Sequence, residues 1–446
     1  MLISVAPDSM QWHMGIGFAA QCKRILDSFG LSDVEVEIKD SNFIRMVETA
    51  VPSQESTSNP VQAQQKAPAN SHTFFEAPVN MARKSWFEEK VQVSKYPGVQ
   101  IASEAHRISG TRGLHLQVMC PDGNSRVMAL TCRHVVFQES ELSGGPLYQY
   151  TPQMPQKWMI QLSDERIRKI QDTIKHWRTV TVAERAGLLE TIRLDEAKAK
   201  PGPPQNELLD KREAFEEVEA LSKHLENHKS RQSRRFGHVF FSAKSTAPDG
   251  WFRNYALICL NEDAYFGGKL PANTIWAPEM FIDFHRTTRY QVDHDRYIKP
   301  RYEIISPATV ELTSHLTKDQ ISEPGECLEG AQFTGEDKDC LVVAMVGAET
   351  WRGTRFGMVN NVKSVTRHAG RWGESISLEV CVISMSRSGS FAHGSDAGAC
   401  VWSLGGQAMG IVSGGVGSGQ ADTTYVSMLD DIFVDLEKAG IQATLL

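Results

Sequence analysis

The stretch that most restricts how this chain can fold is 394–402, Gly-Ser-Asp-Ala-Gly-Ala-Cys-Val-Trp, a glycine-rich loop between two predicted strands. The alternating run 376–383 before it and the apolar run 399–404 after it are both typical of β-strands. A tight loop of this kind presents one side chain and points backbone N–H groups the same way. Acyl transfer needs that arrangement, because the nucleophile must stand beside donors for an oxyanion. The presented residue is Ala397, whose methyl group cannot attack a carbonyl.

Two motifs upstream of this loop also lie at the ends of predicted strands. The run 126–131 leads, through Cys and Arg, into His134, so a histidine follows a strand end. A second run, 249–260, contains Asn254-Tyr-Ala-Leu near its middle. A histidine at a strand end is by itself an ordinary structural residue. Its place ahead of the 394–402 loop makes it a candidate for chemistry.

Taken in order, the three motifs resemble those of the trypsin-like serine proteases. His134 matches the general-base histidine, Asn254 matches the triad aspartate of an Asp-x-Ala-Leu motif, and Ala397 matches the serine of Gly-Asp-Ser-Gly. The resemblance covers roughly 95–438 apart from an insert. It implies a mainly β fold with two six-stranded antiparallel barrels packed at right angles and the three catalytic positions in the cleft between them.

The chain departs from the family pattern at three positions. Ala397 replaces the nucleophile, Asn254 replaces the aspartate, and Ser395 stands where the family keeps a glycine in the oxyanion turn, which residues 395 and 397 form together. An amide can orient an imidazole, but it favours the wrong tautomer and cannot stabilise imidazolium. In the trypsin-like fold this change lowers turnover by roughly 10⁴-fold. Asp249 and Asp263 are nearby carboxylates that could take the orienting role instead.

The resemblance leaves two interpretations of function, and the chain as written is expected to be inactive in both. In the first it is a serine endopeptidase in which engineering replaced the nucleophile with Ala397. The unchanged neighbours Asp396 and Gly398 favour this interpretation. In the second it is a natural pseudoprotease, a protein-binding or scaffold module. Asn254 and Ser395 favour that alternative.

The resemblance also implies a substrate-binding surface. Ser413, Gly414 and Gly415 match the strand edge that lies along a bound peptide, and a gapless count places Phe391 at the floor of the pocket for the residue before the scissile bond. Phe391 offers no carboxylate to a buried Lys or Arg, so we expect a shallow, uncharged pocket for small or medium apolar side chains. In secreted members the counterpart of Asp396 pairs with a new N-terminus. Here we expect an internal partner and no activating cut.

The segments before the protease-like domain differ in composition from it. Residues 1–50 show helical spacing followed by a strand pattern, which predicts a small αβ segment. Residues 52–72 are rich in Ser, Gln, Asn, Pro and Ala, and 51–94 are expected to form a largely disordered linker. The protease domain is expected over 95–446, with its second barrel at about 300–430.

Within the protease-like domain, residues 155–235 interrupt the β pattern. Ser163 precedes apolar residues at three- and four-residue spacing, Pro and Gly follow at 201–204, and a second charged helical pattern comes after them. Such a pattern predicts an antiparallel helical hairpin, 163–229, inserted in a surface loop. Its face is a candidate binding surface for a protein partner.

The charge, the cysteine spacing and the lengths of the apolar runs argue against nucleic-acid binding, metal binding and membrane insertion. The formal net charge of −7 implies no nucleic-acid partner, and the eight cysteines show no metal-binding spacing. No apolar run approaches the length of a membrane span. We therefore expect a peptide or protein substrate, no metal or other cofactor, no membrane partner, and an intracellular location, cytoplasmic or nuclear, with reduced thiols.

Overall fold

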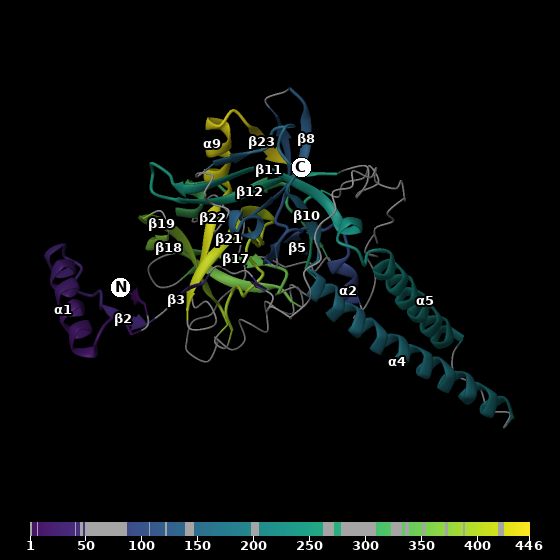
Figure 1. Cartoon of the computed structure of the whole chain (residues 1–446). Coiled ribbons are helices and arrows are strands. Elements are labelled where there is room, and N and C mark those ends of the chain that lie inside the picture. Colours follow the sequence, from purple (N-terminus) through teal and green to yellow (C-terminus); the bar gives the residue numbers. More distant parts are fainter. Residues whose placement is uncertain are drawn as a thin grey trace.

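The computed structural model describes the whole chain except residues 1, 7, 41, 45–47, 50–86, 107, 121–122, 139–146, 198–204, 262–271, 278–308, 323–331, 335–338, 350–352, 371–372, 387–388 and 418–422. Two antiparallel sheets form the centre of the molecule. A small N-terminal unit lies on one side and a pair of long helices projects from the other (Figure 1). The mainly β fold class expected from the sequence is confirmed.

Six strands of the C-terminal half form a closed antiparallel barrel. Their hydrogen-bonded order is β21-β20-β17-β18-β19-β22, and β22 also pairs with β21, which closes the ring. The strands are β17 (Asp339–Met345), β18 (Arg355–Gly370), β19 (Gly373–Ser384), β20 (Cys400–Ser403), β21 (Gln407–Gly417) and β22 (Thr423–Met428). The two strands predicted on either side of the 394–402 loop are therefore present as β19 and β20. Two short strands, β15 (Ser314–His315) and β16 (Gln332–Thr334), add to β21 and β17.

The other sheet is a half-barrel built mainly from the preceding residues. Its strands are β5 (Gln100–Ser103), β6 (Ile108–Thr111), β7 (His115–Met119), β8 (Ser125–Thr131), β9 (Leu147–Gln149), β10 (Trp158–Gln161), β11 (Arg235–Thr246), β12 (Phe252–Leu260) and the C-terminal β23 (Gln442–Leu445). They lie in the order β23-β7-β8-β12-β11-β10-β5-β6, with β9 beside β11. Between β6 and β7 the chain bends, because Arg112 N–H donates to Val99 O (2.9 Å) and Gly113 N–H donates to Leu130 O (2.9 Å).

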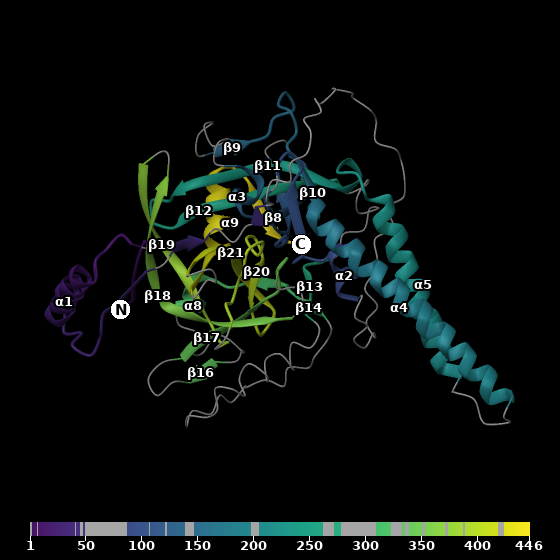
Figure 2. The same ribbon diagram turned by 60° about the horizontal axis from the view of Figure 1, so that its bottom comes forward.

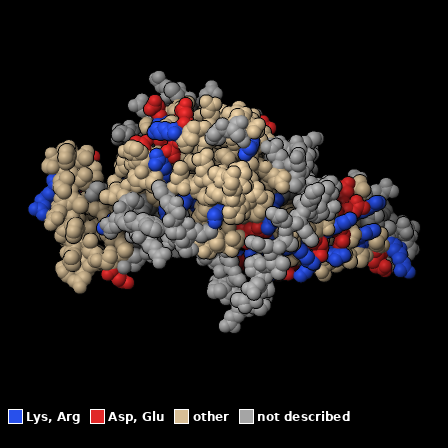
Figure 3. Space-filling view, turned by 45° about the horizontal axis from the view of Figure 1, so that its top comes forward, with Lys and Arg blue, Asp and Glu red and all other residues tan. Residues whose placement is uncertain are grey.

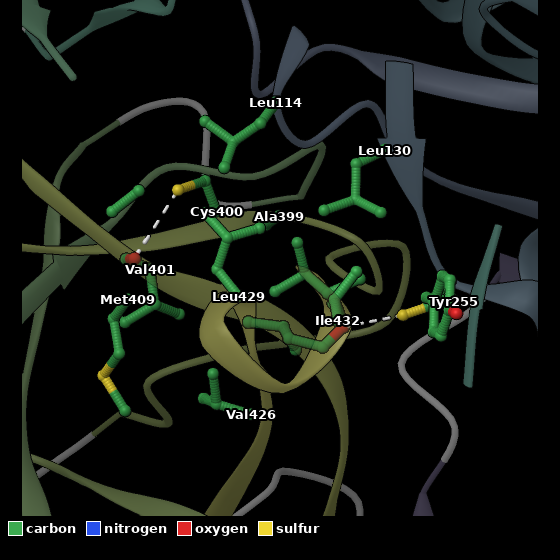
Figure 4. Packing of buried hydrophobic residues seen from close by; sticks show 14 of the residues in the cluster. Leu114, Leu130, Tyr255, Ala399, Cys400, Val401, Met409, Val426, Leu429 and Ile432 are labelled. Atoms are coloured by element: carbon green, nitrogen blue, oxygen red, sulfur yellow. Dashed lines mark hydrogen bonds between the residues drawn. The ribbon is translucent and has the colours of Figure 1, made fainter. Parts of the chain in front are cut away.

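One hydrophobic core joins both sheets to helix α9 (Leu429–Lys438). Figure 4 shows Leu114 and Leu130 of the half-barrel near Ala399 of the barrel and Leu429 of α9, all fully buried. The hydroxyl of Tyr255, on β12, donates to Asp435 of α9 (2.7 Å). Because a close-packed core resists displacement, the two sheets hold a defined position relative to one another.

The predicted helical hairpin is present. Helices α4 (Asp164–Ala197) and α5 (Gln205–Asn227) run side by side away from the half-barrel (Figures 1 and 2). The hydroxyl of Ser163 accepts from Arg166 N–H (3.1 Å), as its capping role requires. Buried apolar side chains pack together between the two helices, among them Ile167, Ile170, Ile174, Val218, Leu221 and Leu225. The outer surface carries acidic and basic residues interspersed (Figure 3).

The N-terminal αβ segment is also present, and it reaches both sheets. Strand β1 (Leu2–Val5) pairs in parallel with β2 (Glu37–Asp40), and α1 (Trp12–Ser28) connects them. After this unit, β3 (Asn42–Ile44) pairs with β21 and β4 (Glu48–Thr49) pairs with β6. Most of the predicted linker lies outside the described residues. Its last part contains α2 (Phe87–Gln92), where Val91 is buried, so the ordered domain begins before residue 95.

The remaining described elements are short. They are the 3₁₀ helix η2 (Gln232–Arg234), the paired strands β13 (Thr274–Trp276) and β14 (Thr309–Glu311), and helix α8 (Lys318–Ser322). The cysteines of the described residues, Cys22, Cys120, Cys132, Cys259, Cys381 and Cys400, are all free. Among the helices that can be described, none has the length and apolar character that crossing a bilayer requires.

Candidate active site

His134 reaches its position through strand register. It lies on α3 (Arg133–Val136), a one-turn helix that follows β8 directly, as the sequence predicted. Strand β8 pairs with β12 so that Thr131 is opposite Ala256. In an antiparallel pair, continuing this register by two residues places Asn254 opposite the start of α3. The His134 and Asn254 side chains are therefore neighbours although they are remote in sequence.

The helix that carries His134 is anchored by the buried side chain of Arg133. Its Nη1 atom donates to the carbonyl oxygen (3.1 Å) and to the hydroxyl (3.0 Å) of Ser242, and its guanidinium lies 4.7 Å from the ring centre of Phe137. Burial lowers the pKa of Arg133 to about 10. Because these contacts tie α3 to β11, the neighbouring imidazole has a fixed support.

The imidazole of His134 is bonded to the amide of Asn254, which is 5% exposed. Atom Nδ1 lies 2.8 Å from Asn254 Nδ2 and 3.1 Å from Oδ1. The donor and acceptor roles depend on the ring tautomer: when Nδ2 donates to Nδ1, the shorter contact, the ring proton resides on Nε2. Atom Nδ2 is also 3.5 Å from the carbonyl oxygen of Ser413. Asn254 thus connects the histidine to the strand edge expected to bind substrate.

Of the two carboxylates proposed as substitutes for Asn254, the one that the structure describes, Asp249, does not take its place. Asp249 is directed to a lysine, with its carboxylate 3.5 Å from Lys318 Nζ. Asp263 lies outside the described residues. The position next to His134 Nδ1 belongs to Asn254.

The loop that carries Ala397 is bonded directly to the strands around His134. The carbonyl oxygen of Ala397 accepts from Thr111 N–H (2.7 Å). The carbonyl oxygen of Val412 accepts from Gly398 N–H (2.8 Å) and from the thiol of Cys132 (3.0 Å), two residues before His134. The loop 394–402, helix α3 with His134, and strand β21 therefore meet at one junction between the sheets. Ala397 is fully buried there.

Close packing at this junction requires glycine. A Cβ atom on Gly110 would overlap both the side chain of Val135 and the carbonyl oxygen of Ala397. Gly398 has φ +91°, and a Cβ there would overlap Thr131 and Thr111. The backbones of the half-barrel and the barrel can approach one another here only because residues 110 and 398 are glycines without a Cβ atom.

Asp396 has internal partners, as expected. It is fully buried, its Oδ1 accepts from Glu349 N–H (2.9 Å), and its Oδ2 accepts from His393 N–H (2.9 Å). Gly347 gives the carboxylate room, because a Cβ atom there would overlap Oδ1. The side chain therefore ties the nucleophile loop to the turn that follows β17.

Ser395 occupies a backbone conformation that suits glycine. Its φ is +67°, in the left-handed region, which costs a residue with a Cβ roughly 1–2 kcal/mol. Its carbonyl oxygen accepts from the Thr111 hydroxyl (2.7 Å), and its hydroxyl is 3.4 Å from that of Ser109. The turn keeps the left-handed geometry although the glycine is missing.

The predicted substrate-binding residues lie in two different environments. Ser413, Gly414 and Gly415 are on β21, where the Ser413 hydroxyl donates to Tyr425 O (3.2 Å). Phe391 is 1% exposed and belongs to the hydrophobic core, against Gly357. A side chain buried to this degree fills the space at its position, and the preference for small apolar residues stays a prediction.

Several residues that build the site carried no signal in the sequence. Ser109, Thr111, Glu349 and Val412 contribute through backbone atoms or through hydroxyls shared by many residues in the chain. Only the two glycines in Ser-Gly-Thr-Arg-Gly, 109–113, hinted that another segment approaches closely there.

Comparison with known proteins adds no assignment, because neither models of known families nor curated proteins match this chain. The described residues also contain no group of three or more His, Cys, Asp or Glu side chains placed to hold a metal ion.

Proposed function

We propose that this chain has the scaffold of a trypsin-like serine endopeptidase and that, with alanine at position 397, it holds peptides without hydrolysing them. The observation that carries the proposal is the convergence of His134, Asn254 and Ala397 at one junction. The three residues lie on separate elements. His134 and Asn254 are bonded to each other, and the backbone of Ala397 is bonded to Thr111. Cys132, two residues before His134, is bonded to Val412.

The arrangement of the sheets supports the same assignment. The barrel formed by β17 to β22 supplies Ala397 and the β21 edge. The half-barrel supplies His134 and Asn254, and the bent stretch 108–119 pairs with β5 at one end and with β8 at the other. We infer that the half-barrel corresponds to the first barrel of the protease fold. The reacting groups would then come from both barrels, as that chemistry requires.

Two separate changes act against hydrolysis in this proposal, one that abolishes it and one that slows it. Ala397 removes the attacking oxygen. Asn254, donating to Nδ1, keeps the ring proton on Nε2, so the atom that should accept a proton from the nucleophile already holds one. The double loss favours a natural pseudoprotease that binds peptide. An endopeptidase inactivated at position 397 alone is the second candidate, and the intact bonding of Asp396 favours it.

Labelling with a fluorophosphonate probe tests the scaffold. In Ala397→Ser protein, we expect slow covalent labelling, mapped by mass spectrometry to residue 397. The added substitution His134→Ala should abolish it, because the nucleophile then has no base. The unaltered chain serves as the control and should not label. Labelling at another residue, or labelling of Ala397→Ser that survives His134→Ala, would contradict the proposed site.

The proposal also includes a protein partner and a cellular location. The hairpin 163–229 is proposed as a docking surface for a protein partner, since its outer face carries exposed charges of both signs, among them Arg212 paired with Glu216. An intracellular location is proposed because the six described cysteines, two of them half-buried and four buried, are free thiols.

A further inference from the structure

The N-terminal segment adds a strand to the edge of β21 that corresponds to the substrate-binding edge. Strand β3 (Asn42–Ile44) runs antiparallel to β21, with Ile44 opposite Gly415. Gly415 lies two residues beyond Ser413, whose carbonyl oxygen contacts the amide of Asn254. An extended segment of the chain itself is therefore paired at the position where a peptide ligand would be expected.

The same segment then pairs with the half-barrel on the other side of the site. Strand β4 (Glu48–Thr49) runs antiparallel to β6, with Glu48 opposite Ser109. The hydroxyl of Ser109 lies 3.4 Å from that of Ser395, and Thr111 on the same stretch donates its N–H to Ala397 O. The second pairing thus lies next to the nucleophile loop.

The two pairings place Ile44 and Glu48 on either side of the site. Ile44 and Glu48 are four residues apart, so their Cα atoms are separated by at most about 14 Å. One residue pairs with the strand edge bonded to Asn254, and the other pairs with the strand bonded to Ala397. Both pairings are antiparallel, which is the direction in which an extended peptide ligand would pair with the β21 edge.

We propose that segment 42–49 is an intramolecular peptide ligand of the His134–Ala397 site, bound along the chain in the orientation of a substrate. Main-chain pairing of an extended peptide with a sheet edge is an established mode of recognition and needs no particular side chain. The binding part of this inference depends only on the two strand pairings. A second part rests on the proposed function: in Ala397→Ser protein, the first peptide bond to be hydrolysed lies between Ile44 and Glu48.

The hydrolysis is balanced by water alone. The serine oxygen attacks the peptide carbonyl and its proton passes through His134 to the departing amine, which leaves an acyl-enzyme. Water then adds to the acyl carbon and releases the carboxylate, and the serine recovers its proton. The products are residues 1 to 44–47 with a new carboxylate and the remainder with a new amine.

Displacing the segment in the unaltered full-length chain tests the binding part. The variant Phe43→Pro/Ile44→Pro removes two N–H groups from β3, and Ser53→Pro/Gln54→Pro is the control with the same change outside the paired strands. A fluorescent peptide of residues 40–51, added in trans, should bind the first variant at least about tenfold more tightly than the control, since a tethered ligand competes at high effective concentration. Hydrogen exchange of residues 415–417 should also become faster in the first variant only.

Equal peptide affinity in the two variants, with unchanged exchange at 415–417, would overturn the inference. The unaltered chain provides a second measurement that does not depend on proline. Excess trans peptide should speed hydrogen exchange of residues 42–44, and no change at saturating peptide contradicts intramolecular binding.

N-terminal sequencing of Ala397→Ser protein tests the cleavage part. We expect a new N-terminus at residue 45, 46, 47 or 48, and a cut at least tenfold slower in the Phe43→Pro/Ile44→Pro background. Protein that labels at residue 397 but stays intact between Ile44 and Glu48 would refute this part while leaving the proposed function standing. Absence of labelling would count against the proposed function, and the peptide-binding measurement would still decide whether the segment is a ligand.

Discussion

Asn254→Asp, introduced into Ala397→Ser protein, should raise the rate of peptide hydrolysis by up to about 10⁴-fold. A carboxylate at position 254 can only accept from Nδ1, so the ring proton moves to Nδ1 and Nε2 is left with a lone pair for the serine proton. The same negative charge stabilises the imidazolium formed in the transition state. The measurement is kcat/KM on a peptide library for the single and the double variant.

Position 249 provides the matched control for that measurement. Asp249→Asn in Ala397→Ser protein should leave kcat/KM unchanged, because the Asp249 carboxylate contacts Lys318 and not His134. If Asn254→Asp gives no gain while Asp249→Asn lowers the rate, then Asp249 is the orienting residue and the present assignment is wrong.

Asp396→Ala should lower the free energy of unfolding by roughly 2–5 kcal/mol, the largest stability loss we expect at the site. Removal of the carboxylate leaves the N–H groups of Glu349 and His393 without their acceptor, and each such loss costs about 1–3 kcal/mol. Urea denaturation of the full-length chain measures the change.

Two other aspartate variants calibrate this prediction. Asp396→Asn keeps one carbonyl oxygen for two donors, so its loss should be intermediate. Asp172→Ala removes an exposed carboxylate that pairs with Lys175 at 3.3 Å, and its loss should stay below about 1 kcal/mol. A cost for Asp396→Ala no larger than that for Asp172→Ala would show that the loop does not depend on this carboxylate.

Much of the fold could be predicted because local patterns in this chain agree with its tertiary structure. Alternating strands and turn residues predicted the strands around residues 126–131 and 376–404, and capping by Ser163 predicted the start of α4. The strand pattern 126–131 also placed His134 just after a strand end. These features are determined by residues that are close together in the sequence, so the sequence alone is enough to predict them.

Contacts that depend on strand register could not be predicted in this way. The pairing of β3 with β21 joins residues near 43 to residues near 416, and nothing in the Asn-Phe-Ile run distinguishes it from other short apolar stretches. The partners of Asp396 are backbone N–H groups, which every residue except proline offers. Phe391 is likewise buried in the core against Gly357 of β18, a contact between remote residues that a gapless count cannot detect.

The protonation state of His134 tests the central claim most directly, because it reports the His134–Asn254 contact in the unaltered chain. Long-range nitrogen–proton NMR of labelled protein should show the neutral ring protonated on Nε2, and Asn254→Asp should move that proton to Nδ1. A ring protonated on Nδ1 in the unaltered chain, or a tautomer that does not respond to Asn254→Asp, would contradict the account.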